Sequence, residues 1–269
     1  MDAVRYAIVD GAIEEGLLEF LEKINPPHCC LYAQPVQPDL VPLAPYLVEV
    51  TPEVETWLQT KESPWGIYLI AEKNMNNLRQ HLRKYLQVLI PDESKPVLFR
   101  FYDPRNIWDF LSVLSEWEKI WFIGPIDKFI TYSNGSYKEE NFSMLKQKYP
   151  QDSGTRRKMM KISHSQMDDL ATIYEQRYVD SLVKNIASWG ENSENIDRQV
   201  ITDTLHWLKE QNITDDRSIR GLFYLFQEKR CLSVDAIPLK FKEILCIDNE
   251  VGVFKAETHI LKELGRIPL

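Results

Sequence analysis

The chain has 269 residues, of which 44% are hydrophobic and 27% are charged. This length and balance are typical of a globular protein with one large or two small domains, and they exclude a small disulfide-stapled protein and a disordered chain. The 32 basic and 40 acidic side chains give a net charge of −8. Because proteins that bind nucleic acid through its phosphates carry the opposite sign, we expect no nucleic-acid partner.

The charge is distributed unevenly along the chain, which indicates two regions. Residues 1–134 hold 12 basic and 19 acidic side chains, a net charge of −7, whereas residues 135–269 hold 20 and 21, a net charge of −1. Aromatic residues make up 11% of the sequence and include seven Trp. Surplus aromatic side chains are common at protein interfaces, so this composition indicates a protein partner.

The four cysteines, Cys29, Cys30, Cys231 and Cys246, show neither paired spacing nor histidines at zinc-ligand distance. Cys29 and Cys30 are adjacent and cannot easily bridge to each other, so we interpret them as small buried apolar residues, with a redox or metal role as the alternative. The N-terminus lacks a signal-peptide pattern, and no apolar run approaches the ~20 residues that span a bilayer. We expect a cytoplasmic protein with no membrane partner.

Strands and helices are predicted to alternate over the first region. Apolar runs predict strands at 6–9, 29–32, 46–50, 66–71 and 97–102, and a last apolar segment covers 121–126. Helical spacing predicts helices at 12–24, 57–58, 72–88 and from 103 through 114. We therefore predict an α/β lobe over residues 1–134, with a mostly parallel sheet flanked by helices.

The second region is predicted to be helical. Polar, turn-rich sequence begins near Tyr132 and predicts a linker or long connection over residues 135–160. Beyond it, apolar spacings of three and four predict a mainly α-helical lobe over residues 161–269. The predicted helices are 166–187, 198–211, 218–227, 239–245 and 251–264.

No common enzyme motif is present: the sequence lacks the nucleotide-binding glycine patterns, the nucleophile elbow, the zinc-protease helix and the calcium loop. The five histidines are isolated along the sequence. We therefore expect no cofactor and no metal. One group of polar residues could carry chemistry: Asp10, Arg79, His81, Arg83, Arg100, Asp103 and Arg105.

Two interpretations of this group are open. In parallel sheets, ligands bind beyond the carboxyl ends of the strands, so Asp10 and Asp103 could act as acid and base while Arg79 or Arg105 clamps an anion. The structural alternative places Asp10 in a turn and Asp103 as a helix cap, with arginines that bind carboxylates and fix the loops. We favour the structural interpretation.

Six sequence blocks together resemble one known family. They are YAIVDGA (6–12), LAPYLVEV (43–50), WGIYL (65–69), LRQHLRKYLQVLIPD (78–92), FRFYDPR (99–105) and FIGPI (122–126). Their order and spacing are similar to the domain of unknown function found in adaptor chaperones of bacterial type VI secretion, over about residues 5–130. One departure is Tyr32-Ala33-Gln34, where the family often has a glycine.

The resemblance implies a non-enzymatic adaptor chaperone that binds a cognate effector protein in the cytoplasm and promotes its loading onto the VgrG spike. In such adaptors the second half varies, which implies that residues 161–269 recognise the individual cargo and that residues 1–134 engage the spike or a common effector domain. The implied structural or partner-binding residues are Asp10, Gly11, Tyr46, Trp65, Arg79, His81, Arg83, Arg100, Tyr102, Asp103, Arg105 and Gly124. The candidate cargo-binding residues are Tyr174, Tyr178, Trp189, Trp207 and Tyr224.

Two other functions stay open. The first is a hydrolase or phosphoryl-transfer enzyme that uses Asp10, Asp103 and Arg105, and the second is a structural subunit of a larger assembly. An enzyme should have a concave pocket with perturbed carboxylates, whereas an adaptor should expose an apolar groove or patch.

Overall fold

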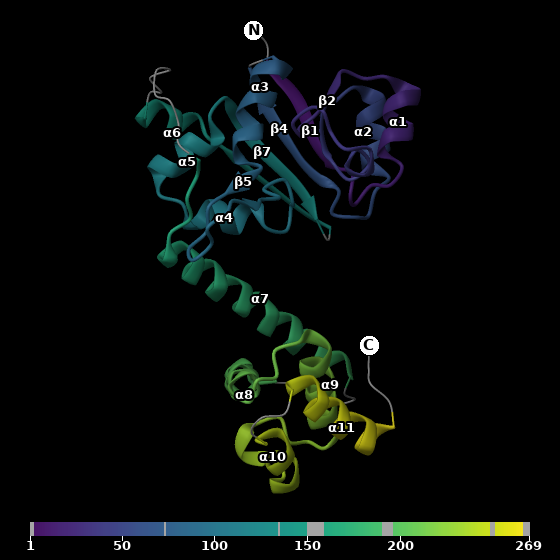
Figure 1. Cartoon of the computed structure of the whole chain (residues 1–269), viewed down its shortest axis with the longest axis vertical. Coiled ribbons are helices and arrows are strands. Elements are labelled where there is room, and N and C mark those ends of the chain that lie inside the picture. The colour runs from purple at the N-terminus through teal and green to yellow at the C-terminus, as the bar shows by residue number, and fades with distance from the viewer. Residues whose placement is uncertain are drawn as a thin grey trace. The chain divides into compact units, whose positions relative to one another are not determined.

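The structure is a computed structural model that describes residues 3–72, 74–133, 135–149, 159–189, 196–247 and 251–265. The chain forms two units, residues 1–170 and 171–269, and each has its own apolar core (Figure 1). The division between the units falls inside helix α7 (His164–Trp189).

The first unit is built on a six-stranded sheet with the order β2-β3-β1-β4-β7-β8. Each pair of neighbouring strands is antiparallel, so the predicted mostly parallel sheet is wrong. The strands are β1 (Val4–Asp10), β2 (His28–Cys30), β3 (Pro45–Glu49), β4 (Gly66–Ala71), β7 (Ile126–Ser133) and β8 (Ser136–Asn141).

The error has a topological cause. Helix α1 (Leu17–Ile24) joins β1 to β2 and helix α2 (Pro52–Gln59) joins β3 to β4, and each joined pair runs in the same direction, as strand-helix alternation predicts. However, β3 lies between β1 and β2, and β1 lies between β3 and β4. This interleaved β-α-β-β-α-β order is the split, ferredoxin-like arrangement, in which neighbours are antiparallel.

Side chains alternate along the strands between two apolar layers. On β1, Tyr6 and Ile8 belong to one core cluster, whereas Ala7 and Val9 belong to another. Helices α1 and α2 cover the face of Ala7 and Val9. The opposite face is covered by three helices, and Figure 1 shows the two sets on either side of the sheet. These are α3 (Met75–Leu82), α4 (Ile107–Val113) and α5 (Glu116–Ile123).

Two predicted elements of the first unit are shorter than expected. The helix expected at 72–88 ends at Leu82, where a 3₁₀ turn (Arg83–Tyr85) leads into β5 (Gln87–Val88). The strand expected at 97–102 is only β6 (Val97–Leu98), which pairs with β5 in a separate small sheet. A further 3₁₀ turn spans Pro38–Leu40.

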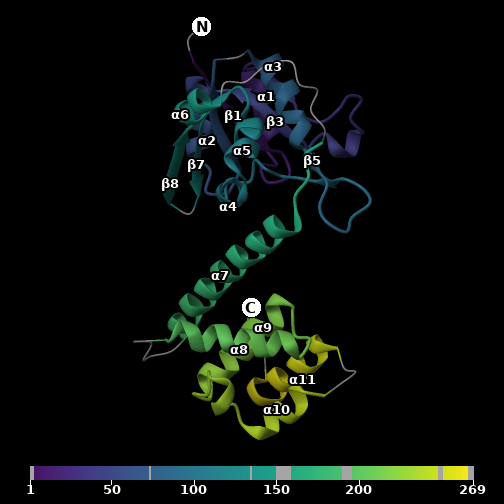
Figure 2. The ribbon, with the colours of Figure 1, turned by 90° about the vertical axis from the view of Figure 1, so that its left-hand side faces the viewer.

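Part of the predicted linker at 135–160 is regular structure. Residues 136–141 form β8, which pairs with β7 as a hairpin, and α6 (Ser143–Lys148) follows it (Figure 2). Residues 150–158 of the predicted linker lie outside the described residues.

The second unit contains the predicted helices close to their expected bounds. They are the end of α7, then α8 (Arg198–Glu210), α9 (Asp216–Glu228), α10 (Leu239–Leu245) and α11 (Gly252–Leu264), with a 3₁₀ turn at Val234–Ala236. Asp215 caps α9, because its carboxylate accepts a hydrogen bond of 2.8 Å from the backbone N–H of Ser218. Among the described residues, no helix combines the length and the apolar character needed to cross a bilayer.

A buried lysine fastens α11 to two other helices. The Lys255 ammonium donates hydrogen bonds to the backbone carbonyls of Gln211, at 2.8 Å, and Ile247, at 3.2 Å. These carbonyls lie at the C-terminal ends of α8 and α10, where the helix dipole favours a positive charge.

His259 on α11 is a second buried polar group, with only 2% of its surface exposed. Its ring packs against Phe241 with centroids 4.9 Å apart, and its Nε2 has no hydrogen-bond partner among the described residues. Burial lowers the pKa of His259, and the hydrogen bond with the Phe241 backbone and the charge of Glu263 offset only part of this effect. The imidazole is therefore neutral in the folded unit.

We expect His259 to make the chain less stable in mild acid. Because the folded pKa is below the unfolded one, the stability is fully present above the ordinary value of about 6.5 and is lost as the pH falls below it, by at most about 1.4 kcal/mol per pH unit. Melting temperatures at pH 7.5 and 5.5 should differ more for the wild type than for His259→Phe, which keeps the ring contact. Equal shifts for the two proteins would contradict this expectation.

Candidate functional site

Asp10 ends β1 and is tied to three other segments. Its backbone N–H donates to the carbonyl of Trp65 at 2.8 Å, and its Oδ1 accepts from the N–H of Ala12 at 3.0 Å. Its Oδ2 forms an ion pair with the guanidinium of Arg100. Only 2% of Asp10 is exposed, so the carboxylate depends on these donors in place of water.

Asp103 and Arg105 form a second pair beside the first. The Asp103 carboxylate accepts from the Nε of Arg105 at 2.9 Å and from its Nη2 at 2.7 Å, and also from its backbone N–H at 2.9 Å. Burial alone would raise the pKa of Asp103, but the hydrogen bonds from Arg105 outweigh burial and lower it. Asp103 is therefore held ionised.

The prediction that Asp103 caps a helix is wrong. The residue before α4 is Asn106, whose side chain makes no capping bond, and the Asp103 carboxylate instead closes a tight turn onto Arg105. The carbonyl of Asp103 accepts from the N–H groups of Asn106 and Ile107, both at 3.1 Å, so only its backbone helps to begin the helix.

Two tyrosines complete this group. Burial, followed by the charge of Asp10, raises the pKa of both Tyr102 and Tyr32. We call Asp10, Tyr32, Arg100, Tyr102, Asp103 and Arg105 the polar cluster. It joins the end of β1, the segment after β2 and the segment between β6 and α4.

The predicted polar group is only partly assembled. Arg79 instead donates from Nε to the carbonyl of Cys30 at 2.9 Å. His81 donates from Nε2 to the carbonyl of Phe122 at 2.7 Å, and Arg83 lies half-buried in the turn after α3. The expectation that the ends of parallel strands collect several of these residues therefore fails together with the parallel sheet.

Other residues of the resemblance support the backbone. The N–H of Gly11 donates to the carbonyl of Ala44 at 3.1 Å, and a Cβ on Gly11 would lie 2.3 Å from the carbonyl oxygen of Pro42. Gly124 ends α5 with a φ of 51°, and a Cβ there would meet the ring of His81. Both glycines allow close packing that another residue would prevent.

A shallow cavity of about 810 Å³ lies beside β2 and includes Tyr46, Arg79 and Cys29 in its wall. Tyr46 donates from its hydroxyl to the carbonyl of Val41 at 3.1 Å. Burial raises the pKa of the Cys29 thiol to about 11, so its reactive thiolate form is disfavoured.

In the second unit, the five candidate cargo-binding residues have different environments. The rings of Trp189 and Tyr224 pack edge to face with centroids 5.3 Å apart, Trp207 is half-buried, and Tyr178 donates to Asp216 at 3.0 Å. Tyr174 is the most accessible, with 43% of its surface exposed.

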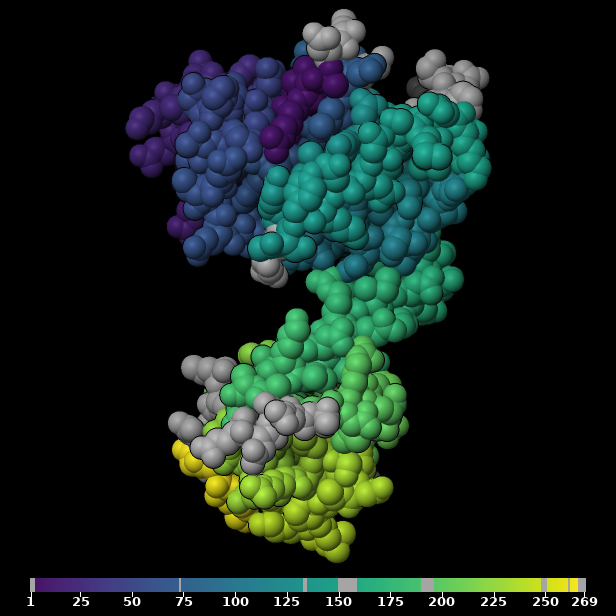
Figure 3. Space-filling model, turned by 180° about the vertical axis from the view of Figure 1, so that it is seen from behind, coloured from purple at the N-terminus to yellow at the C-terminus, as the bar shows by residue number. Residues whose placement is uncertain are grey.

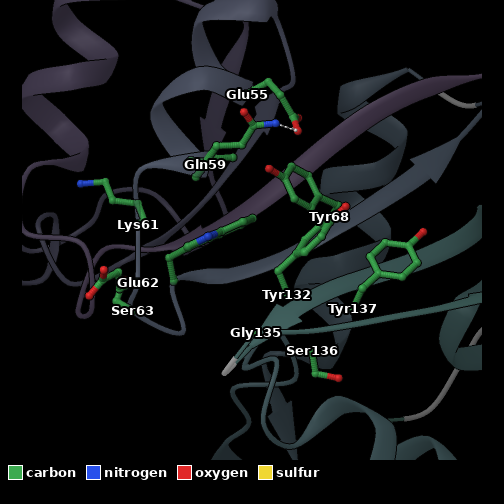
Figure 4. Close-up of a pocket in the computed structure, with 12 residues that line it drawn as sticks. Glu55, Gln59, Lys61, Glu62, Ser63, Tyr68, Tyr132, Gly135, Ser136 and Tyr137 are labelled. Carbon is green, nitrogen blue, oxygen red and sulfur yellow. Dashed lines mark hydrogen bonds between the residues drawn. The ribbon is translucent and has the colours of Figure 1, made fainter.

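Sequence reasoning missed a second concave site, which we call the aromatic pocket. It has a volume of about 610 Å³ and lies between the end of α2, the segment before β4, and the strands β4, β7 and β8 (Figure 4). Seen from behind, the blue segment that contains α2 lies beside the teal β7-β8 hairpin, with the purple start of β1 between them (Figure 3).

A row of four aromatic rings runs along the aromatic pocket. The centroids of Trp65 and Tyr68 are 4.9 Å apart, those of Tyr68 and Tyr132 are 6.0 Å apart, and those of Tyr132 and Tyr137 are 5.0 Å apart. Tyr132 and Tyr137 face each other across the β7-β8 hairpin. They are 48% and 51% exposed, so part of this row is open to solvent.

One wall of the pocket holds an internal cation. The guanidinium of Arg5 lies over the ring of Tyr68, 4.0 Å from its centroid, and its Nη1 is 3.0 Å from Oε2 of Glu55. Burial and the charge of Glu55 raise the pKa of Tyr68, which keeps its hydroxyl protonated. Gln59 donates to the other oxygen of Glu55 at 3.0 Å.

The charge at the other end of the pocket is net negative. The Lys61 ammonium lies 3.0 Å from the carboxylate of Glu14 and 4.2 Å from the ring centroid of Trp57. Glu14 also accepts a hydrogen bond from Ser63. Glu62 is exposed and forms no ion pair with a described residue, so its charge is not neutralised.

The sequence does contain a signal for the hairpin that carries Tyr132 and Tyr137. Residues 134–135 are Asn-Gly, the pair that most strongly favours a two-residue hairpin turn. This pair would then have indicated a β-hairpin at 134–135 rather than a linker.

We expect the two ion pairs of the polar cluster to contribute unequally to the free energy of unfolding. Arg100→Met should lower the free energy of unfolding by about 1–3 kcal/mol, because it leaves the buried carboxylate of Asp10 without its cation. Arg105→Met should cost less than about 1 kcal/mol, since Arg105 is half-exposed and its backbone N–H still binds Asp103. Urea unfolding of both variants tests this order.

A double variant is the control. The double variant, Asp10→Asn with Arg100→Met, removes both charges. Its loss in free energy of unfolding should be smaller than the sum of the losses of the two single variants. A larger loss for Arg105→Met than for Arg100→Met would contradict the assigned roles.

The comparisons with known proteins give one match. Residues 5–119 match the family described as a domain of unknown function (DUF4123), a segment that runs from β1 into α5 and contains the whole polar cluster. No curated protein and no solved structure is similar enough to the chain to be matched. Tyr132 and Tyr137 of the aromatic pocket lie beyond the matched segment. The first unit is thus similar to this domain family over most of its sheet.

Proposed function

We propose that the chain is a non-enzymatic adaptor chaperone of type VI secretion, which binds a cognate effector in the cytoplasm and promotes its loading onto the VgrG spike. The match of residues 5–119 to a domain of unknown function agrees with the resemblance drawn from the sequence blocks. The match itself assigns no partner, so the adaptor activity is a proposal.

The observation that carries the proposal is the aromatic pocket. Its row of rings is partly exposed and lies on a rigid sheet, and aromatic side chains dominate the binding energy of protein interfaces. An adaptor needs such a surface, because it must hold its cargo through contacts alone.

Nothing in the described residues favours the hydrolase alternative. A general acid needs a carboxyl group that holds a proton near neutral pH. The Asp10 carboxylate is paired with Arg100, and Arg105 lowers the pKa of Asp103. The polar cluster is thus suited to holding three segments of the first unit together.

Deletion of the gene in its native host tests the proposal. We expect the culture medium to lose one effector while it keeps the spike protein, because an adaptor serves its cargo and not the secretion apparatus. Mass spectrometry of the medium measures both, and the tagged full chain should restore the effector and co-purify with it. An unchanged set of secreted proteins would refute the adaptor function.

A second expectation concerns the helical unit. Tyr174→Ala should weaken binding of the co-purified effector about thirtyfold, since truncation of a true anchor costs ~2 kcal/mol or more. Lys184→Ala, another exposed position on α7, is the matched control and should leave the affinity unchanged. Titration of the effector into each full-length variant measures both affinities, and equal values would exclude Tyr174 as an anchor.

A further inference from the structure

We propose that the aromatic pocket binds an arginine or lysine side chain presented by an extended segment of a protein partner. This inference rests on the proposed function in one respect, namely that the segment belongs to the effector. The binding chemistry itself follows from the rings, the charges and the strand edge of the first unit.

Two cations of the chain near the pocket are already held in the same way. Arg5 lies over the ring of Tyr68 beside Glu55, and Lys61 lies over the ring of Trp57 beside Glu14. In both, an aromatic face and a carboxylate together hold one positive charge, which is the arrangement that favours cation–π binding.

The outer rings offer a third aromatic face on which a cation could lie. Tyr132 and Tyr137 are half-exposed, and no cation from a described residue lies over either ring. The Tyr137 hydroxyl donates to Glu139, which raises the pKa of Tyr137 to about 12. The carboxylate of Glu139 is itself paired with the Lys128 ammonium at 3.0 Å, so the unmatched negative charge of the pocket comes from Glu62. Figure 4 shows both rings beside Tyr68, on the side of the pocket opposite Lys61 and Glu62.

The charge of the pocket complements a cation. Each cation near the pocket is matched by a carboxylate, Arg5 by Glu55, Lys61 by Glu14 and Lys128 by Glu139, whereas Glu62 forms no ion pair with a described residue. Residues 1–134 as a whole carry 12 basic and 19 acidic side chains. A field of this sign attracts a basic segment and repels an acidic one.

The neighbouring strand explains why the partner is an extended segment. β8 is the last strand of the sheet and pairs with β7 only, so its other edge has unpaired backbone groups among the described residues. An extended peptide can add to such an edge while its alternate side chains enter adjacent pockets. The volume of about 610 Å³ leaves room for residues that flank the basic one.

The probes are three acetylated and amidated peptides of seven residues, in which glycine and serine flank one central residue. That residue is arginine, its uncharged analogue citrulline, or leucine. Each peptide is titrated into the full-length chain, with binding followed by NMR at low salt. We expect the arginine peptide to bind at least threefold more tightly than either of the others, and its affinity to fall as salt is added.

Variants locate the binding. Tyr132→Leu and Tyr137→Leu keep apolar bulk but remove the ring face, so each should weaken the arginine peptide about three- to tenfold, whereas Tyr132→Phe and Tyr137→Phe should retain most of the affinity. Glu62→Gln should also weaken binding, while Glu93→Gln, an exposed position between β5 and β6, should not. Melting curves of all variants confirm that they fold.

Three results would overturn the inference: equal binding of the arginine and leucine peptides, no effect of the leucine variants, or no binding of any peptide. These results are distinct from a failure of the proposed function. If secretion of an effector depends on the chain but the chain binds no arginine peptide, the adaptor function is supported and the cation-binding pocket is refuted. If the arginine peptide binds but the secretion of no effector depends on the chain, the cation-binding pocket is supported and its assignment to an effector is refuted.

Discussion

The pairing of β7 with β4 is the constraint on which the rest of the first unit depends. The four strands β1 to β4 and the helices α1 and α2 form a split β-α-β unit by themselves. Addition of β7 and β8 extends the sheet past α2, and the rings of Tyr132 and Tyr137 are left half-exposed on the extension. The aromatic pocket lies at the boundary between the part of the sheet that α1 and α2 cover and the part that β7 and β8 add.

The same extension is well supported on its opposite face. Phe129 of β7 packs edge to face with Phe142, with centroids 5.5 Å apart, and Trp108 of α4 donates to Thr131 at 2.7 Å. One face of the hairpin is thus fixed by core contacts, which holds the tyrosines of the other face in place without a covering helix. A binding surface built in this way loses little conformational entropy when a partner binds.

Local patterns predicted the elements better than the way they assemble. The apolar run at 66–71 and the helical spacing over 198–211 were sufficient to predict β4 and α8, because each pattern depends on neighbouring residues. Strand order depends on contacts between distant segments, so alternation of strands and helices did not reveal that β3 lies between β1 and β2. The polar cluster shows the same limit. Asp10 and Arg100 were correctly predicted to lie together, but the reason given, a shared edge of a parallel sheet, was wrong.

Under the proposed function, the chain must bind its cargo and later release it, and weak contacts at two separate surfaces would meet that requirement. One cation over exposed rings contributes only about 0.5–1 kcal/mol, so a single pocket holds a segment weakly. Affinity rises when a second surface of the same chain binds the same partner, because the second contact then forms at a high effective concentration. Loss of either contact returns the other to its weak intrinsic affinity. If the proposed function holds, an effector that needs both the aromatic pocket and a surface of the helical unit would be held firmly and would be released when one contact is displaced.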